Sequence, residues 1–292
     1  MLTYFQAIII GLIQGVTELF PISSLGHSVL LPTLFGWHNL VAAQSDKESY
    51  FLAFLVGLHV ATALALLWFY RQQWVRIIGG FFTSVRKLKI ATANERLAWL
   101  LIVATIPAGL FGLIFERTLR LLFAKPLAAA IFLSINGLIL LVGDRLMKRS
   151  NAKTKPKSRD LAETTANLGV LRYRDAAVIG TAQTFSLFAG ISRSGITMVG
   201  GLLRGLDHED AARFSFLLAT PIILAAGVVK LPDLAGPLGD GVRGQVLAGS
   251  IAAALAAYVA VRFLDRFFRN NRLTPFGIYC LVFGLAMVAV IH

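Results

Sequence analysis

Two stretches at matching positions decide the fold of this chain: residues 14–28 read QGVTELFPISSLGHS and residues 183–197 read QTFSLFAGISRSGIT. A gapless offset of 169 residues superposes them, and the matches continue to glycines on either side. The superposed pairs are Gly11 and Gly180, Gln14 and Gln183, Ile22 and Ile191, Ser23 and Ser192, Gly26 and Gly195, Ser28 and Thr197, and Gly36 and Gly205. Residues that end and restart helices rarely coincide in this way by chance, so the pattern indicates an internal repeat.

The composition excludes a protein that folds in water. Hydrophobic residues make up 57% of the 292 residues and charged residues only 15%, against about a quarter in an ordinary soluble domain. The net charge of +13 is concentrated in short loops between apolar runs, as membrane topology demands, so we exclude nucleic-acid binding. A single cysteine, Cys280, excludes an intrachain disulfide. Because Gln6, Gln14 and Glu18 interrupt the first apolar stretch, we do not expect a cleaved signal peptide.

Six apolar runs approach the length of about 20 residues that a helix needs to cross a bilayer. They are residues 51–70, 97–115, 126–143, 214–229, 246–261 and 275–292. The fourth and fifth runs are short, and need flanking Arg and Lys side chains to reach the headgroups. Two further apolar stretches, 7–34 and 176–203, are interrupted by Pro, Gly, Ser and charge, and we predict that each is a re-entrant helical hairpin.

Each half of the chain then consists of one re-entrant hairpin followed by three transmembrane helices. Because three spans reverse the direction of the chain, the second copy stands upside down, which is an inverted-topology repeat. We predict an all-α polytopic membrane protein with a first repeat at residues 1–147 (hairpin about 3–36) and a second at 175–292 (hairpin about 175–206). Residues 148–174 are the predicted cytoplasmic linker.

The basic residues set the orientation, because cytoplasmic loops hold the excess of Lys and Arg. Residues 71–96, 145–174, 204–213 and 262–272 together carry twenty-one of them. The other face carries six, which are Lys47, Arg117, Arg120, Lys125, Lys230 and Arg243. The count places both termini and the mouth of the first hairpin outside the cytoplasm.

Two charged residues stand apart from the rest. Of fifteen acidic residues only Glu18 lies inside an apolar stretch, and of twenty-eight basic residues only Arg193 does. A charge at membrane depth costs several kcal/mol unless it is paired or hydrated, so both are functional candidates. They lie in equivalent hairpins, which would meet near the midplane. A purely structural ion pair between them is the alternative interpretation.

The first stretch gathers a carboxylate, two hydroxyls and an imidazole. Gln14 and Glu18 share a helix face, and Ser23, Ser24 and His27 share another after a proline ends that helix. Ser24 beside His27 is the pattern of a nucleophile with its acid or base. Glu18 is a candidate ligand for Mg²⁺, which prefers one or two carboxylates together with phosphate oxygens and waters, and Gln14 can add a carbonyl oxygen.

The second stretch has the ingredients of a phosphate site. Arg193 supplies a guanidinium, and Ser192, Ser194 and Thr197 supply hydroxyls. A helix restarts after Gly190, so free backbone N–H groups are expected beside them. The hydroxyls of Ser192 and Ser194 are equally compatible with capping the broken helix.

Two other features have simpler interpretations. His59 is a lone imidazole in the first span, and we interpret it as a hydrogen-bonding residue between helices. Residues 207–210, DHED, look like metal ligands, but an Asp followed by acids in the next turn is typical of a helix N-terminus. We therefore predict a cap there.

Over nearly the whole chain, the sequence resembles the bacitracin-resistance family of undecaprenyl-pyrophosphate phosphatases. Residues 14–27 match its first motif, a Glu-or-Gln-x-x-x-Glu helix that leads into Pro-x-Ser-Ser-x-Gly-His. Residues 189–197 match its second, Pro-Gly-x-Ser-Arg-Ser-Gly-x-Thr. Ala189 replaces the proline of the family, and Leu25 stands where a small hydroxyl residue is usual. Neither departure removes a reacting group.

The resemblance implies hydrolysis of undecaprenyl pyrophosphate to undecaprenyl phosphate and phosphate at the outer face of the bacterial cytoplasmic (inner) membrane. It also implies recycling of the lipid carrier for peptidoglycan synthesis, and bacitracin resistance. The partners are then a polyprenyl pyrophosphate and membrane lipids, and a homodimer is left open. By position, the resemblance implies that Ser24 attacks and that His27 shuttles the proton. A divalent cation (Mg²⁺, or Ca²⁺ as the alternative) would be held by Glu18 and Gln14. The phosphates would be bound by Arg193, Ser23, Ser192, Ser194 and Thr197.

Two alternatives stay open at this point. A metal-activated water can replace Ser24 as the attacking group, which leaves Ser24 as a phosphate ligand. A polyprenyl-phosphate flippase or transporter has the same architecture, because secondary carriers are also built from inverted repeats with broken helices. Hydrolysis needs an attacking group as well as a phosphate site, and the first stretch supplies one.

Overall fold

The structure is a computed structural model that describes residues 2–37, 40, 50–115, 125–150, 165, 167–169 and 171–292. Its secondary structure is helical, and the described residues contain no strand. The predicted linker, 148–174, falls largely on residues 151–164, which lie outside the described part of the chain. So do Lys47, Arg117 and Arg120, three of the basic residues used for the orientation.

Six helices of the described chain are long and apolar enough to cross a membrane. They are α4 (Tyr50–Phe69), α6 (Ala93–Ile114), α8 (Pro126–Ser150), α12 (His208–Lys230), α14 (Arg243–Phe267) and α15 (Thr274–Ile291). Each covers one of the six predicted runs to within one residue at its end, which confirms a polytopic all-α membrane protein. Shorter elements connect them: α5 (Arg71–Lys87) follows α4, and α13 (Pro232–Ala235) and η2 (Pro237–Gly239) link α12 to α14.

α12 and α14 are longer than the predicted runs 214–229 and 246–261. Both helices continue into turns of polar residues, which a search for apolar runs leaves out. α12 begins within the predicted cap, where Asp207 accepts a hydrogen bond from the Asp210 N–H at 2.8 Å. The side chain of His208 lies 2.7 Å from Asp144 of α8, and so ties this end of α12 to a neighbouring span. The prediction of a helix N-terminus at residues 207–210 is confirmed.

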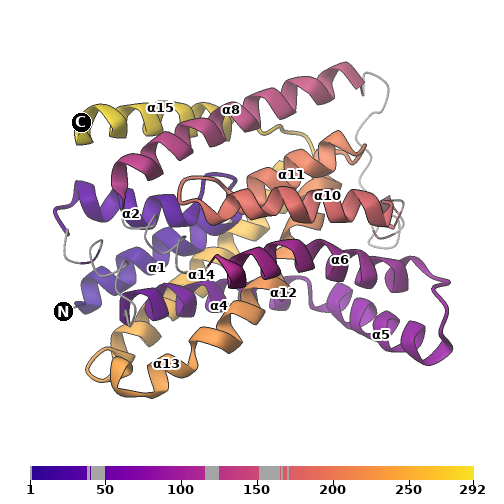
Figure 1. Cartoon of the computed structure of the whole chain (residues 1–292), viewed down its shortest axis with the longest axis horizontal. Helices are drawn as coiled ribbons and strands as arrows, with labels where there is room; N and C mark the ends of the chain where they lie inside the picture. The colour runs from indigo at the N-terminus through magenta and orange to yellow at the C-terminus, as the bar shows by residue number, and fades with distance from the viewer. Residues whose placement is uncertain are drawn as a thin grey trace.

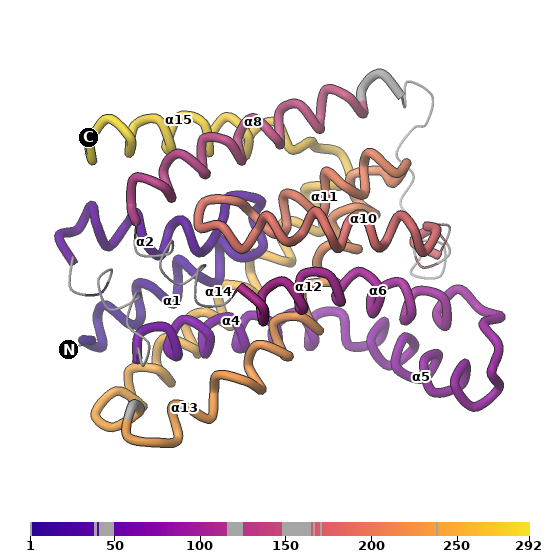
Figure 2. The backbone as a smooth tube through the Cα atoms, in the orientation of Figure 1, coloured from indigo at the N-terminus to yellow at the C-terminus, as the bar shows by residue number. Residues whose placement is uncertain are grey.

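Two helical hairpins occupy the interrupted stretches. The first consists of α1 (Tyr4–Leu19) and α2 (Ser24–Leu34), and the second of α10 (Tyr173–Gln183), η1 (Thr184–Leu187) and α11 (Arg193–Leu203). They enter the bundle from opposite ends, and both chain termini lie at the end where the first hairpin enters (Figures 1 and 2). We call residues 20–23 and 184–192 the tips of the two hairpins.

The tips touch each other through a serine that also caps a helix. Ser23 is the N-cap of α2, where its Oγ accepts from the Gly26 N–H at 3.2 Å, and the same Oγ accepts from the Gly190 N–H at 3.1 Å. Ser23 has a φ of 70°, a conformation that a non-glycine residue holds only when its surroundings fix it. The two accepted bonds supply that constraint. Ser192 caps α11 in the same way, from the Gly195 N–H at 3.1 Å.

Glycines let the hairpins approach neighbouring spans closely. A Cβ added at Gly11 of α1 would lie 2.2 Å from the Gly249 carbonyl oxygen of α14. A Cβ at Gly180 of α10 would lie 2.3 Å from the Ala104 oxygen of α6. In lipid, where water gives no driving force between helices, such close backbone packing is a main source of association. It holds both hairpins in place around the tips.

Candidate active site

A cavity of about 260 Å³ lies where the two tips meet α4 and α12. Its polar lining residues are Glu18, Ser23, Ser24, His59, Ser186, Ser192 and Arg193. Its apolar walls include Leu52, Leu55 and Val56 of α4 and Ile222, Ile223 and Ala226 of α12. A polar cluster bordered by aliphatic walls suits an amphiphilic ligand with a polar head and a hydrocarbon tail.

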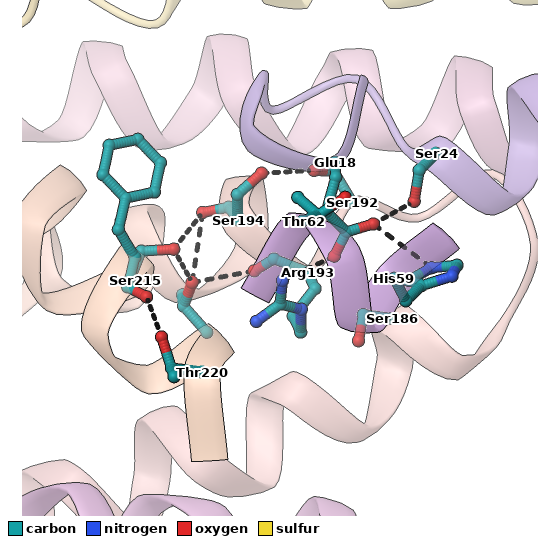
Figure 3. A network of polar contacts seen from close by, with 12 residues as sticks. Glu18, Ser24, His59, Thr62, Ser186, Ser192, Arg193, Ser194, Ser215 and Thr220 are labelled. Atoms are coloured by element: carbon teal, nitrogen blue, oxygen red, sulfur yellow. Dashed lines mark hydrogen bonds and ion pairs between the residues drawn. The ribbon is translucent and has the colours of Figure 1, made fainter. Parts of the chain in front are cut away.

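The carboxylate of Glu18, which is 6% exposed, is the centre of this cluster. Arg193 donates from Nη2 to its Oε1 at 2.6 Å. Its Oε2 accepts from Ser24 Oγ at 2.5 Å and from Gln14 Nε2 at 2.9 Å, and lies 3.2 Å from His59 Nε2. Figure 3 shows Glu18 between Arg193, Ser24 and His59. The two charges that stand alone in apolar sequence therefore meet as an ion pair in the structure.

Both hairpins deliver a helix N-terminus to this point. Ser24 is the first residue of α2 and Arg193 is the first residue of α11. The N-terminus of a helix carries a partial positive charge and unpaired N–H groups, which favour an anion. The local sequence explains the geometry, since Pro21 follows the end of α1 and the serines at 23 and 192 restart helices as N-caps. The arrangement is suited to a phosphate beside the cluster.

His59, which we set aside on sequence grounds, lines the cavity. The interhelical hydrogen bond expected for it is present, but the partner is Glu18. Its Nδ1 lies 2.7 Å from the Leu55 carbonyl oxygen and therefore donates to it. With Nδ1 a donor, Nε2 can contact a carboxylate favourably only if it also carries a proton. His59 and Arg193 thus contact the same carboxylate.

The structure does not bring His27 into the cavity. Its Nδ1 lies 2.7 Å from the Ser23 carbonyl oxygen, and its Nε2 lies 2.8 Å from the hydroxyl of Tyr279 on α15. The ring is 2% exposed and stacks against Tyr279 and Phe283. A neutral imidazole that donates at Nδ1 and accepts at Nε2 satisfies both contacts. The proton-shuttling role stays a prediction without support from this geometry.

The hydroxyls of the second hairpin divide into two groups. Ser192 lines the cavity with Arg193, although its Oγ also caps α11 and lies 3.0 Å from Ser194 Oγ. Ser194 donates to the Phe20 carbonyl at 3.2 Å, and Thr197 contacts Ser215 of α12 at 2.6 Å. Neither Ser194 nor Thr197 lines the cavity in this structure. Their bonds attach α11 to the first tip and to α12.

A residue that sequence reasoning missed connects the two tips. Asn136 of α8 is fully buried, and its Nδ2 donates to the Pro21 carbonyl at 3.0 Å. Its Oδ1 accepts from the Ser192 N–H at 3.0 Å. One amide thus fixes the first tip and the cap of α11 relative to each other. The available signal was a single Asn within the third apolar run.

The predicted metal ligands fit a cation only in part. Glu18 lines the cavity, whereas Gln14 is fully buried and donates its Nε2 to Glu18, with Oε1 lacking a partner. Among the described residues, no three His, Cys, Asp or Glu side chains gather as ligands. Because both oxygens of Glu18 already contact donors, a cation here would have to displace at least one donor and be held mainly by the oxygens of a ligand, which is how Mg²⁺ often binds phosphates.

Comparison with known proteins assigns the family. The protein family described as "Bacitracin resistance protein BacA" matches residues 7–286, which include both tips. Undecaprenyl-diphosphatase 2 of Frankia alni is 53% identical, over 97% of this chain and 96% of the relative. Undecaprenyl-diphosphatase of Mycolicibacterium paratuberculosis is 54% identical, over 97% and 95%. Undecaprenyl-diphosphatase 2 of Chromobacterium violaceum is 44% identical, over 96% of each chain. On a match of this extent, the chain belongs to the bacitracin resistance protein BacA family.

Proposed function

We propose that this chain hydrolyses undecaprenyl pyrophosphate to undecaprenyl phosphate and inorganic phosphate. One observation carries the proposal: a serine hydroxyl and a guanidinium bind the same buried carboxylate, at two helix N-termini, in a cavity with aliphatic walls. The names of the relatives support the same substrate. The activity would recycle the lipid carrier of peptidoglycan synthesis and confer bacitracin resistance.

Ser24 is the attacking group of the proposed reaction. Its Oγ–H already donates to Glu18 Oε2, so the carboxylate can take the proton as Oγ bonds to the terminal phosphorus. The bond to the bridging oxygen breaks, undecaprenyl phosphate leaves, and water then hydrolyses the phosphoserine to release phosphate. The geometry favours Glu18 over His27 as the proton acceptor. Attack by a water in place of Ser24 gives the same products without a phosphoserine.

Arg193 and the two helix N-termini bind the phosphates in this scheme. The guanidinium now binds Glu18, and a pyrophosphate beside it would share that charge through two oriented bonds. Ser23 and Ser192 line the same wall as caps, and their tips present the backbone N–H groups of α2 and α11. Ser194 and Thr197 are then supports that hold α11 in place.

A divalent cation, Mg²⁺ or Ca²⁺, is proposed at Glu18. When bound, it would withdraw negative charge from the pyrophosphate and so assist attack by an oxygen nucleophile. Gln14 does not line the cavity, but its Nε2 donates to the carboxylate of Glu18 and so supports the site. Its Oε1 is buried without a partner, and the sequence predicts this oxygen as a second ligand of the cation.

We also propose that the hairpins are re-entrant and that the halves form an inverted-topology repeat. The matching caps at Ser23 and Ser192, and the entry of the hairpins from opposite ends, support this (Figure 2). The aliphatic cavity walls come from the first half of α4 and the last half of α12, which both lie toward the end that holds the chain termini (Figure 1). By the count of basic residues that end faces outward in the cytoplasmic membrane.

Phosphate release from undecaprenyl or farnesyl pyrophosphate by purified protein tests the function. We expect release by the parent, nearly none by Ser24→Ala, and loss of release in EDTA that Mg²⁺ restores. Acid-quenched protein should carry phosphoserine if Ser24 attacks. A folded Ser24→Ala protein with parental turnover would assign attack to water, and an inactive parent with transport of polyprenyl phosphate across vesicles would favour the carrier.

A further inference from the structure

A second cavity, of about 290 Å³, lies toward the side of the bundle away from the chain termini, where α4 passes into α5 (Figure 1). It forms there against Arg213 in the second turn of α12 and Asp265 near the end of α14. Its lining shares no residue with the first cavity. It is large enough for a group many times the size of a water, which needs roughly 10 to 15 Å³ measured in this way.

Buried donors without acceptors line this cavity. Gln73 is 1% exposed, and neither its Nε2 nor its Oε1 has a hydrogen-bond partner. Arg213 is 8% exposed, and its Nε has none either. Buried polar atoms are normally paired, so the cavity is built for a polar occupant. The unpartnered groups are two N–H groups of the Gln73 amide, one N–H of Arg213 and one amide oxygen, whichever way the amide is oriented. Donors outnumber acceptors three to one, so the occupant should be rich in hydrogen-bond acceptors.

The cavity also receives the N-terminus of a long helix. α5 is 17 residues long, and its N-cap, Tyr70, makes no side-chain capping bond. The first N–H groups of a helix lack partners within the helix, and the macrodipole makes that end positive. Gln73 stands in this first turn, so the unpaired amide and the helix end act together. Both favour an anion, and a phosphate above all.

The acidic residues nearby do not cancel this preference. Asp265 accepts from Arg213 at 3.1 Å and from Arg269 at 3.1 Å, and the same two arginines lie 3.8 Å from Glu209. Two arginines therefore balance two carboxylates. Arg71, which also lines the cavity, leaves an excess positive charge beside the unpaired donors.

The surroundings indicate lipid as the source of the phosphate. Four side chains on one face of α5 are exposed, and they are Val75, Ile78, Phe82 and Val85, at 72%, 48%, 65% and 45%. Such an apolar stripe on a basic helix is typical of one that lies against lipid headgroups. Trp68, an interfacial residue type, is 64% exposed, and the Arg71 guanidinium lies 5.0 Å from its ring. We propose that the cavity bounded by Tyr70, Gln73 and Arg213 binds the phosphate of a lipid headgroup.

Lipid-dependent thermal unfolding in detergent tests this proposal. We expect phosphatidylglycerol to raise the Tm of the parent by a few degrees, and diacylglycerol with the same chains to have no effect. Gln73→Leu removes the donor, and Gln73→Glu repels a phosphate, so both should lose most of the shift. Gln183→Leu is the matched control: Gln183 is also 1% exposed with both amide atoms unpartnered, but it lines neither cavity. It should retain the full shift.

A second arm distinguishes the source of the phosphate. Inorganic phosphate should give little stabilisation, and if it gives the same Gln73-dependent shift as the lipid, the site binds free phosphate. Equal shifts in the parent and in both Gln73 variants, or an equal loss in Gln183→Leu, would overturn the proposal. Phosphate release from farnesyl pyrophosphate should be unchanged in the Gln73 variants, which separates this outcome from any failure of the proposed hydrolysis.

Discussion

The two hairpin tips share one capping pattern and divide the chemistry between them. In each, a serine accepts a hydrogen bond from the glycine three residues later, at 3.2 Å for Ser23 and 3.1 Å for Ser192. The residue after the cap is Ser24 in the first hairpin and Arg193 in the second. The same local frame therefore presents a hydroxyl from one side of the cavity and a guanidinium from the other.

The difference continues before the tips, where Glu18 of the first hairpin matches Leu187 of the second. Glu18 binds both first residues of the restarted helices, whereas Leu187 contributes an apolar wall to the same cavity. The two hairpins share the same serine-capped helix break, and differences at two matched positions, 18/187 and 24/193, make the site asymmetric. The comparison predicts that the frame determines folding and that the differing residues determine turnover.

Of the effects on which the two tips differ beyond Ser24, the largest is expected at Arg193. Arg193→Lys keeps the charge but loses the planar fork that binds a phosphate through two bonds, so turnover should fall far more than apparent affinity. We expect a loss equivalent to about 2 to 4 kcal/mol in the barrier, as for other preorganised donors. The measurements are kcat, KM and detergent-stable yield for Arg193→Lys and Arg193→Gln.

A structural ion pair predicts a different pattern for the same variants. Removing one partner of a buried pair leaves the other charge uncompensated, so yield would fall in Arg193→Gln and in Glu18→Gln. The double variant would then recover yield. Folded but inactive single variants support the phosphate site, and an active Arg193→Lys or Arg193→Gln protein would eliminate it.

A smaller effect should separate the two imidazoles. His59 contacts the carboxylate inside the cavity, whereas His27 is held by Ser23 and Tyr279 outside it. His59→Gln should fold and lose about tenfold to a hundredfold in kcat, the value of a hydrogen bond to a charged group. His27→Gln should keep its specific activity and lower the Tm. Turnover assays beside thermal unfolding decide this, and the opposite pattern would return the proton-handling role to His27.

Sequence alone could predict the tips because their residues interrupt helices. Proline, glycine and capping serines break an apolar run wherever it is placed, and Glu18 and Arg193 are conspicuous as charges within such runs. The six spans could be predicted for the same reason, since length and apolar composition are local properties.

The side chains that reach the site from regular spans could not be predicted in the same way. α4 is apolar on every face, so nothing in its periodicity indicates which face His59 shares with the cavity. Asn136 of α8 presents the same difficulty, and packing against neighbouring helices decides both.

Ser24 and His27 were assigned to one face of α2, but three residues leave them about 60° apart. That angle sends one to Glu18 and the other to α15.

A weaker effect should distinguish the matched pair Gln14 and Gln183. Gln14 donates to Glu18 at 2.9 Å, whereas Gln183 is buried without a partner for its amide. Gln14→Leu should lower kcat by about tenfold or less, and Gln183→Leu should leave it unchanged. Gln14→Glu should be tolerated with Mg²⁺ present, because a second carboxylate can also bind the cation. Parental activity in Gln14→Leu would show that Gln14 contributes only to packing and has no role in turnover.

The last prediction leaves activity untouched and tests which ends of the hairpins face outward. Lys89, just after α5, and Lys125, just before α8, are both exposed, and the end of α5 and the start of α8 lie at opposite ends of the bundle (Figure 1). In a Cys280→Ser background, Lys125→Cys should react with a membrane-impermeant thiol reagent in intact spheroplasts, because the count of basic residues puts that end outside. Lys89→Cys should react only after permeabilisation, which also controls for its accessibility. Cys280 is fully buried near Asn136 and Pro21, so serine retains a polar atom there.

The reverse labelling would turn the cavity of Glu18 and Arg193 toward the cytoplasm and the cavity of Gln73 outward. Hydrolysis would then have to take place on the inner leaflet, although the arrangement of the two hairpins would be unaltered.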